Sequence, residues 1–356
     1  MSKIACIADL HINIFSRGNK MFPFIMDFFK FFKEVCIKEK VEMIIIAGDL
    51  FDFKTTSQTE GLVNISIALD ELAELFKIII INGNHDRASK TDEKMSLPKL
   101  FHNKKNIMVV DDYKCLVFDD AHLHFLSFFE DEELVEKIKF KIPTTNKNVK
   151  HVLFSHFALN GFTMNKYIKN DEMHYAINES SLLNKKLLKS FDKVFLGDFH
   201  GHQTDGVITY ISSPFQLRHG DEYTEHGFII IDTNTYEYDF YENPHTPEYV
   251  TTKLNKNNLK ELVKLKNCYI NLVVSSNINK EKLILVKEKL LQKNLGVSII
   301  NESEDNHEIA VVEGWDIVVK QNQEDMIKSY LDLNSEIIKK NNWNIDDMFK
   351  LIISKE

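Results

Sequence analysis

The first half of the chain alternates short apolar runs with longer segments whose apolar residues recur at helical spacing. Three such runs lie at 3–8, 43–47 and 78–81, and the segments 24–40 and 57–76 between them have the period of an amphipathic helix. Apolar runs that alternate with helices are typical of parallel strands covered on both faces. The pattern therefore predicts β-α-β units and an α/β fold.

The second half of the chain is less regular. From 207 to 241, several short apolar runs predict consecutive antiparallel strands, and the polar stretch 242–252 with its prolines predicts a domain boundary. Beyond it, a strand, a helix and a strand predict a small α/β domain at 250–318. Helices with an apolar stripe are predicted at 322–356, where they either pack on the chain's own core or dock another protein. The first domain is expected to span 1–243.

The composition is typical of a soluble globular protein, with 44% hydrophobic and 27% charged residues. No apolar stretch approaches the roughly 18 residues that cross a bilayer, and the N-terminus shows no secretory signal. The four cysteines lack Cys-x-x-Cys spacing, which favours free thiols in a reducing compartment. We therefore expect a cytoplasmic protein (in the host cytoplasm if the source is viral) with no membrane association.

The formal net charge is −9. A protein that binds DNA unaided usually has a basic surface, so this balance argues mildly against such a role. It is compatible with a cluster of acidic metal ligands, whose bound cations would attract phosphate. It is also compatible with a partner that supplies much of the contact with DNA. Charge alone does not choose between these alternatives.

Polar residues interrupt or follow five of the apolar strands. In open α/β sheets, ligands bind beyond the carboxyl ends of the strands, so these residues are expected to gather at one edge. Taken singly, each motif has a plainer explanation, such as a turn, a helix cap or a hydrogen-bonded histidine. Taken together and in this order, they indicate a site. The five motifs are Asp9-Leu10-His11, Gly48-Asp49-Leu50-Phe51-Asp52, Gly83-Asn84-His85-Asp86, Ser155-His156 and Gly197-Asp198-Phe199-His200.

These residue types suit a pair of divalent metal ions. Carboxylate, imidazole and amide oxygen donors bind Mn, Fe or Zn and need no thiolate. Two metals about 3.5–4 Å apart can orient a water, lower its pKa and hold the attacking and leaving oxygens of a phosphoryl group. Asp49 is the natural candidate for a carboxylate between the metals. Gly48, Gly83 and Gly197 are expected to let the backbone turn sharply after each strand.

The motifs resemble those of the calcineurin-like metallophosphoesterases. Within that family, the segments 49–52, 210–216 and 226–228 are similar to those of the SbcD-type recombination nucleases, which pair with the SMC-like ATPase SbcC. The resemblance covers 1–240 well and the remainder only in layout. It implies an α/β fold of the metallophosphoesterase type, a four-layer β-sandwich with flanking helices. A small α/β capping domain and C-terminal helices would follow it.

The resemblance also implies which residues hold the metals. One metal would be held by residues from the first, second and last of the five motifs, namely Asp9, His11, Asp49 and His200. Asp49 would bridge to a second metal, whose other ligands would include Asn84 and His156. The family commonly has Gly-His-x-His where this chain has Asp198 two residues before His200.

Asp198 is kept as a ligand of the second metal, because a carboxylate still binds a hard dication. An alternative register uses His202 instead. The added negative charge predicts a preference for oxygen-loving Mn²⁺ or Mg²⁺.

The remaining site residues have supporting roles. By resemblance, His85 would protonate the leaving group or stabilise the charge of the transition state. Asp52 and Asp86 are expected to orient histidines from behind. Arg17 and Arg87 follow the first and third motifs, so each either contacts substrate phosphate or is a solvated surface residue.

The function predicted is a metal-dependent DNA nuclease. The resemblance implies exonuclease activity on duplex ends, endonuclease activity on single strands and two Mn²⁺ ions, with Mg²⁺ as the alternative. It also implies an SbcC-type ATPase partner, a homodimer and a role in DNA recombination, repair or replication. The alternative enzyme is a calcineurin-like phosphatase or phosphodiesterase for a small phosphoester, which would not need the region after 242. A non-catalytic scaffold is disfavoured because such proteins typically lose several ligands, and none of the main ones is missing here.

Overall fold

The computed structural model describes residues 3–12, 20–52, 59–87, 95–142, 148–169, 172–178, 182–255, 258–275 and 280–301. The chain divides into two compact units, 1–300 and 301–356. The helices predicted at 322–356 and the predicted substrate contact Arg17 lie outside the described residues. Among the helices within them, none is long and apolar enough to cross a membrane.

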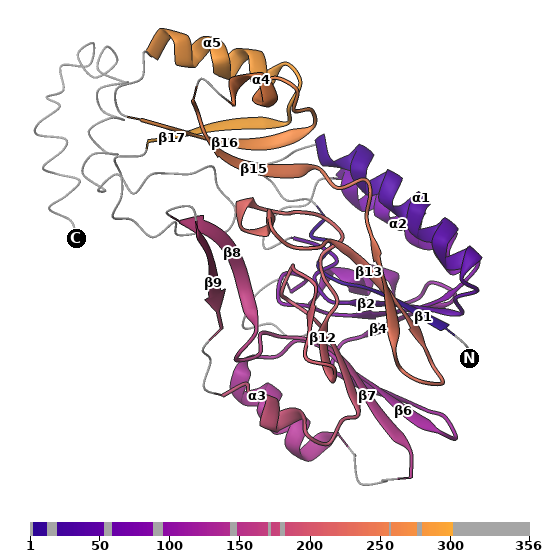
Figure 1. Ribbon diagram of the computed structural model, residues 1–356. Helices are drawn as coiled ribbons and strands as arrows, with labels where there is room; N and C mark the ends of the chain where they lie inside the picture. The colour runs from indigo at the N-terminus through magenta and orange to yellow at the C-terminus, as the bar shows by residue number, and fades with distance from the viewer. Residues whose placement is uncertain are drawn as a thin grey trace, which may run out of the picture. The chain divides into compact units, whose positions relative to one another are not determined.

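The first sheet has six strands in the order β14-β13-β1-β2-β3-β4 (Figure 1). Strands β1 to β4 are parallel, as the alternation with helices predicts, and β13 is antiparallel to both β1 and β14. Helices α1 (Phe22–Lys38) and α2 (Thr59–Ala73) connect the first three strands. The strands are β1 (Lys3–Ile7), β2 (Met43–Ala47), β3 (Lys77–Ile81), β4 (Ile107–Val110), β13 (Gly227–Asp232) and β14 (Tyr238–Glu242).

The second sheet also has six strands, in the order β11-β12-β10-β7-β6-β5. Its four central strands are parallel to one another, whereas β5 and β11 at the two edges are antiparallel to the strands beside them. Short helical segments accompany it: α3 (Asp131–Glu136), η3 (Lys137–Lys141) and η4 (Lys185–Leu188). The strands are β5 (Tyr113–Val117), β6 (Ala121–Leu126), β7 (Lys150–His156), β10 (Lys193–Gly197), β11 (Gln203–Thr204) and β12 (Ile208–Tyr210).

The two sheets pack face to face, and helices cover their outer faces. Successive residues of β1 show this, since Cys6 lies in the core between the sheets and Ile7 lies in the core under α1 and α2. Between the sheets, the rings of Phe125, Phe154 and Phe195 stack across three neighbouring strands at 5.4 Å. A third core lies between the second sheet and α3. The predicted four-layer α/β sandwich is therefore confirmed.

The antiparallel strands predicted between 207 and 241 are corrected in part. Strand β12 is parallel to β10 in the second sheet, whereas β13 and β14 form an antiparallel pair in the first sheet. The chain crosses between the sheets at a turn where Ser212 has φ 103°. Hydrophobic runs do not reveal which sheet a strand joins, so the pattern concealed this crossing. The hairpin of β8 (Thr163–Lys169) and β9 (Glu172–Ile177) was not predicted.

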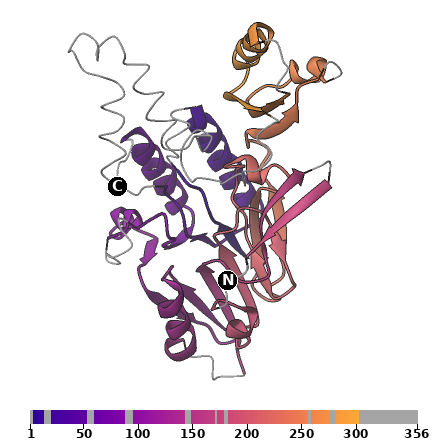
Figure 2. The ribbon, with the colours of Figure 1, turned by 90° about the vertical axis from the view of Figure 1, so that its left-hand side faces the viewer.

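A small three-stranded sheet of order β15-β16-β17 follows β14. Helices α4 and α5 lie on one face of it (Figures 1 and 2). It has its own apolar core, which includes Ile270, Leu272 and Leu290. This segment has the strand-helix-strand pattern expected at 250–318, although its role as a capping domain stays a prediction. Its elements are β15 (Glu248–Lys253), α4 (Leu259–Leu262), β16 (Cys268–Val274), α5 (Lys280–Leu291) and β17 (Gly296–Asn301).

Candidate metal centre

The five motifs lie at or just after the carboxyl ends of β1, β2, β3, β7 and β10. Because these strands are parallel within each sheet and the sheets face each other, their ends meet at one edge of the sandwich. Hydrogen bonds between backbone atoms of one sheet and side chains of the other join the two sheets there. The amide of Asp198, after β10, donates to Asp9 Oδ1 at 3.0 Å, and His156 Nδ1, at the end of β7, donates to the Ala47 carbonyl oxygen at 2.9 Å.

The carboxylate of Asp49 lies between two histidines. Its Oδ2 atom is 3.4 Å from His11 Nε2 and 3.3 Å from His156 Nε2. On one side, Asp9, His11 and His200 place one ligand atom each within 4.8 Å of one another. On the other, Asp9, Asp49 and His156 do the same. A carboxylate placed in this way would be within reach of ions held on both sides.

Two further oxygen donors surround His156. Asn84 Oδ1 is 3.1 Å from His156 Nε2, and Asp198 Oδ1 is 3.8 Å from the same nitrogen. By contrast, His202 is engaged elsewhere: its Nδ1 hydrogen-bonds the Tyr210 carbonyl oxygen at 3.0 Å and its Nε2 lies 3.1 Å from the Tyr238 hydroxyl. The geometry therefore favours Asp198 over His202 as the donor beside His156.

The backbone at the strand ends is in an uncommon conformation. Asp9, His11, Asp49 and Asp198 have φ angles of 53°, 43°, 51° and 98°. Non-glycine residues seldom adopt this left-handed region, which costs of order 1–3 kcal/mol each and clusters at functional sites. This conformation turns the backbone sharply after each strand. It thereby brings the polar side chain to the edge that the strands share. Four such residues in one cluster indicate selection for the site rather than for stability.

Histidines around the cluster are oriented through their Nδ1 atoms. His85 donates to Asp52 Oδ1 at 2.7 Å, and His200 donates to Asp221 Oδ2 at 3.1 Å. Such a bond fixes the ring and the tautomer, so that the other nitrogen is the one presented to a metal or substrate. Asp52 thus orients a histidine as expected. His85 is also tied to Asp49, because its backbone amide donates to Asp49 Oδ1 at 2.9 Å.

Asp86 contacts backbone rather than the histidines it was expected to orient. Its two carboxylate oxygens accept from the amides of Phe51 and Gly83, each at 2.9 Å. These bonds tie the loop after β2 to the loop after β3. Asp86 therefore helps to place Asp49 and Asn84 relative to each other, since one precedes Phe51 and the other follows Gly83 in the chain.

Two residues of the site carried no signal in the sequence. Asp221 is 2% exposed and holds His200, yet it lies 21 residues further along the chain. Arg218 lies beside it, with Nε 3.5 Å from Asp221 Oδ1 and a side chain that is 30% exposed. The guanidinium also lies close enough to Asp198 to lower the pKa of that carboxyl slightly, against the stronger effect of burial. Arg218 is therefore a positive group at the edge of the cluster.

Arg87 has a different environment from the one expected for a phosphate contact. Its guanidinium donates to the Phe128 carbonyl oxygen and lies 5.3 Å and 5.0 Å from the ring centres of Phe128 and Phe129. The residue is 6% exposed. This packing anchors the loop after β3 and gives no support to a role for Arg87 in substrate binding.

The electrostatics of the cluster match a site built for cations. Burial raises the pKa of Asp9 to about 8 and that of Asp198 to about 6, whereas burial lowers the pKa of His11 to about 3. The buried His11 Nε2 also has no hydrogen-bond partner. Carboxylates that resist ionisation and an unpartnered imidazole nitrogen are both stabilised by a bound divalent ion. The residues present therefore fit the predicted pair of metals.

Comparison with known proteins gives the same assignment. The model of the calcineurin-like phosphoesterase family matches residues 2–225. Exonuclease subunit 1 of Enterobacteria phage T4 is 26% identical over 251 residues, which are 68% of this chain and 68% of that protein. A subunit of the SbcCD nuclease of Staphylococcus saprophyticus is 21% identical over 259 residues, which are 65% of each chain.

A solved structure, a dimetal phosphatase from Danio rerio, matches with a TM-score of 0.38 and 12% identity. It covers 65% of this chain and 92% of that one, and it is too distant to add to the assignment. The family match and the two nucleases confirm the resemblance that the strand-end motifs carry, and they support the prediction of a phosphodiester hydrolase. Because the family model covers more than half of the chain, the chain belongs to the calcineurin-like phosphoesterase family.

Proposed function

We propose that the chain is a DNA nuclease that hydrolyses phosphodiester bonds with two divalent metal ions. The observation that carries the proposal is the position of Asp49, whose Oδ2 atom lies 3.4 Å from His11 Nε2 and 3.3 Å from His156 Nε2. A carboxylate so placed between two sets of nitrogen and oxygen donors serves two cations better than one. The two sets lie together at the edge of the sandwich where the parallel strands end.

Asp9, His11 and His200 would hold one metal, and Asn84, His156 and Asp198 the other. When bound, the ions would activate a water and neutralise phosphate charge. The second set offers two oxygen donors and one nitrogen, which favours Mn²⁺ or Mg²⁺ over softer ions.

His85 is the proposed acid or electrostatic stabiliser for the leaving group. Asp52 fixes its ring through Nδ1 at 2.7 Å, so Nε2 is the nitrogen presented to the substrate. His85 also lies beside the cluster, since its ring centre is 4.8 Å from that of His11. A protonated Nε2 can donate to the leaving oxygen of a phosphodiester, and the negative charge of Asp52 supports that protonation.

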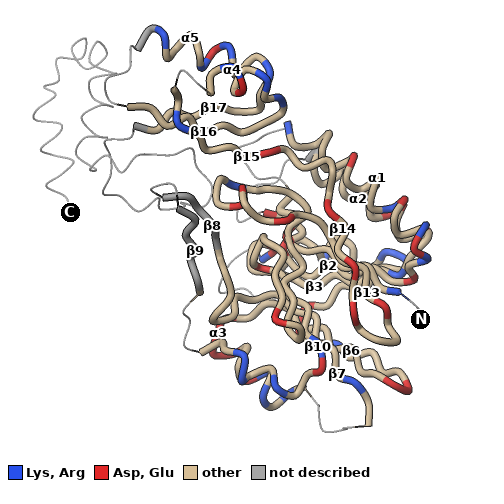
Figure 3. Tube along the Cα trace, viewed as in Figure 1, with Lys and Arg blue, Asp and Glu red and all other residues tan. Residues whose placement is uncertain are grey.

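DNA is proposed as the substrate on two grounds. Both relatives are named as nucleases, one of them an exonuclease subunit. The segment 248–301 also differs in charge from the rest of this acidic chain, because it contains ten lysines, four glutamates and no arginine or aspartate. Figure 3 shows lysines along α4 and α5 of this segment. A basic module beside an acidic catalytic domain suits contact with a phosphate backbone.

A partner is proposed from the same relatives. One is a subunit of SbcCD and the other is called exonuclease subunit 1, so both act within assemblies. We propose an SbcC-type ATPase that docks on the predicted helices 322–356, together with homodimerisation. A role in DNA recombination, repair or replication would follow from such an assembly.

The test is Mn²⁺-dependent digestion of an end-labelled linear DNA duplex by the wild type and by His85→Ala. We expect the variant to lose roughly 10²- to 10⁴-fold in rate, the range typical of a lost general acid. His102→Ala is the matched control, because His102 is exposed, and it should digest DNA at the wild-type rate.

A small chromogenic phosphodiester is assayed in parallel. Its hydrolysis without any digestion of DNA, in the presence or absence of a candidate ATPase, would replace the nuclease with the small-substrate phosphodiesterase. Equal DNA digestion by wild type and His85→Ala would instead remove His85 from the mechanism.

A further inference from the structure

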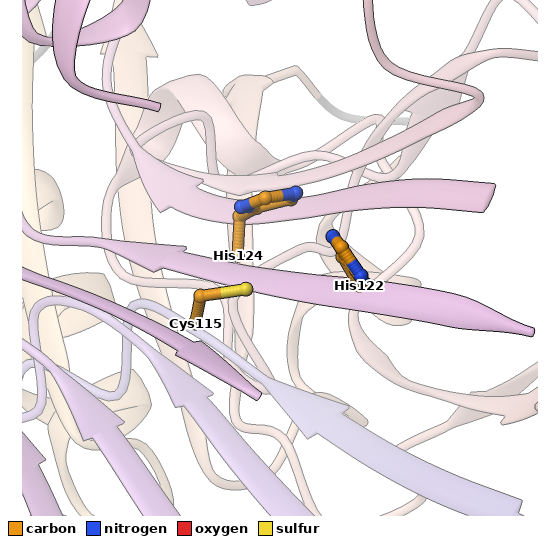
Figure 4. A group of neighbouring side chains, drawn as sticks. All are labelled: Cys115, His122 and His124. Atoms are coloured by element: carbon orange, nitrogen blue, oxygen red, sulfur yellow. The ribbon is translucent and has the colours of Figure 1, made fainter. Parts of the chain in front are cut away.

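A second cluster of metal-binding side chains lies on the second sheet. Cys115 on β5 and His122 and His124 on β6 place one ligand atom each within 4.8 Å of one another (Figure 4). His151 on β7 joins them, with Nδ1 3.0 Å from His124 Nε2 and its ring centre 5.2 Å from that of His122. Three neighbouring strands thus contribute one cysteine and three histidines.

The register of the strands explains this convergence. Cys115 is the direct cross-strand partner of His124, and His151 is the direct partner of His122. His122 and His124 are two residues apart and therefore share a face of β6. Leu123 between them lies in the core shared by the two sheets, so the cluster occupies the opposite face of the second sheet.

This cluster is separate from the catalytic centre. His151 is near the start of β7 and His156 is its last residue. Five residues of extended strand span roughly 16 Å at about 3.3 Å per residue. An ion held by the second cluster would therefore not share ligands with the metals at the strand ends.

Neighbouring side chains hold the cluster in place, and part of it is reachable from solvent. The Tyr113 hydroxyl lies 2.8 Å from His124 Nδ1 and orients the ring. His124 is fully buried and His151 is 3% exposed. Cys115 and His122 are partly exposed, which leaves a route for the ion to enter.

We propose that Cys115, His122 and His124 form a zinc site, with His151 as the neighbouring donor that can complete four-coordination. Cysteine sulfur and histidine nitrogen are both Zn²⁺ ligands, and with His151 the set reaches the four donors of a tetrahedral structural site. On binding, a zinc–sulfur bond replaces the S–H bond of Cys115, and the proton passes to solvent. A thiolate disfavours hard Mn²⁺ or Mg²⁺, so the two sites would select different ions.

The site would have a structural role. Strand β5 is at the edge of its sheet and pairs only with β6 among the described strands. A zinc ion shared by Cys115 and the histidines would crosslink this edge strand to β6, and to β7 if His151 is a ligand. Zinc should then raise the melting temperature of the protein without entering the catalytic reaction.

Titration of the chelator-treated full chain with Co²⁺ tests the proposal. Cobalt replaces zinc and gives a sulfur-to-metal charge-transfer absorption only when a thiolate is a ligand. The proposed catalytic ligands include no cysteine, so this band reports the new site alone. We expect the band in the wild type, its loss in Cys115→Ser and its retention in Cys268→Ser, which removes a different cysteine. Asp49→Asn should also retain it, because that change affects only the catalytic centre.

His122→Gln provides a second variant in case Cys115→Ser fails to fold. His122 is partly exposed, so its replacement should preserve the sheet while weakening Co²⁺ binding at least roughly tenfold. Zn²⁺ should displace the cobalt band in the wild type and raise its melting temperature. Absence of the band in folded wild-type protein, or an unchanged band in folded Cys115→Ser, would overturn the proposal. Unaltered affinity in His122→Gln would remove His122 from the ligand set.

Discussion

At the scale of single residues, charge and burial oppose each other at Asp49. Burial alone would raise the pKa of this carboxyl, but His156 and the other neighbouring histidines hold it well below its usual range. The pKa of His156 is in turn well above its usual value, because the attraction of Asp49 and its other acidic neighbours outweighs burial. The two side chains form an ion pair in the metal-free protein. A bound divalent ion would replace the proton on His156 and keep Asp49 ionised.

Arg218 is the residue for which we expect the clearest effect on substrate binding. Its Nε is buried without a hydrogen-bond partner, and its only recorded ion pair among the described side chains is the 3.5 Å contact with Asp221. A phosphate at the cluster would gain a charge-assisted hydrogen bond from it. Arg218→Gln should therefore raise KM for DNA roughly 10- to 100-fold while changing kcat less, since one such bond contributes about 1.5–3 kcal/mol.

Steady-state kinetics on duplex DNA check this expectation, with Lys114→Gln as a control for the loss of an exposed positive charge. Lys114 is exposed on β5, in the second sheet. An equal rise in KM for both variants would mean that Arg218 acts only through the overall charge of the protein. A fall in metal affinity in Arg218→Gln would instead assign it to the support of Asp221 and His200.

At the scale of elements, the loops after the strands are packed too tightly for most side chains. Gly48 has a φ of +88°, as the expected sharp turn requires. Gly83 and Gly197 have a different reason to be glycine: a Cβ atom at Gly83 would lie 2.0 Å from Asp49 Oδ1, and one at Gly197 would lie 2.6 Å from His156 Nδ1. The absence of a side chain at these positions leaves room for the ligands themselves.

Gly83→Ala should weaken Mn²⁺ binding and lower the rate of Mn²⁺-dependent hydrolysis roughly 100-fold, while the protein still folds. The added methyl group would displace the Asp49 carboxylate, and a displacement of about 1 Å can cost 10²-fold in rate. Gly161→Ala is the matched control, because its Cβ would meet nothing within 4 Å and its φ of +87° imposes only backbone strain. That control should lose about 1 kcal/mol of stability and keep its metal affinity. Calorimetric Mn²⁺ titration and circular dichroism of both variants provide the measurements. Wild-type metal binding in Gly83→Ala would contradict the expectation.

At the scale of the whole molecule, the buried carboxyls make stability depend on pH and on metal. Burial raises the pKa of Asp9 to about 8 and that of Asp86 to about 7, from a usual value of 3.8. Up to those pH values the folded chain holds protons that the unfolded chain has released. The free energy of unfolding of the metal-free protein therefore falls as the pH rises. His156 acts in the same direction above its usual value of 6.5.

The expected result is a lower melting temperature at pH 8 than at pH 6.5 for the chelator-treated protein. This window avoids the opposite contribution of His11, whose lowered pKa of about 3 adds stability with rising pH only below 6.5. Saturating Mn²⁺ should remove most of the decline, because the ions replace the protons as partners of the carboxylates. Thermal unfolding at both pH values, with and without Mn²⁺, gives the melting temperatures that test this expectation. A melting temperature that rises from pH 6.5 to 8 without metal would show that the carboxyls are already ionised.

The sequence by itself determined the parallel strands of the first sheet and the polar residues that follow the strands of both sheets. These features depend on local periodicity, since apolar runs of strand length between amphipathic helices allow few folds. The motifs also indicated the family, because five short patterns in a fixed order seldom arise by chance. The position of each motif residue at a strand end also follows from the sequence, because the motif comes at the end of an apolar run.

Only the tertiary structure decided which side chains meet. Asp221 reaches His200 across 21 residues, and Cys115 meets His124 because an antiparallel hairpin brings them opposite each other. Only the tertiary structure shows that His202 is engaged away from the cluster, because its partners come from β12 and β14. Contacts between residues distant in the chain depend on strand register and on how the sheets pack. Local periodicity contains no information on the register of the strands or on the packing of the sheets.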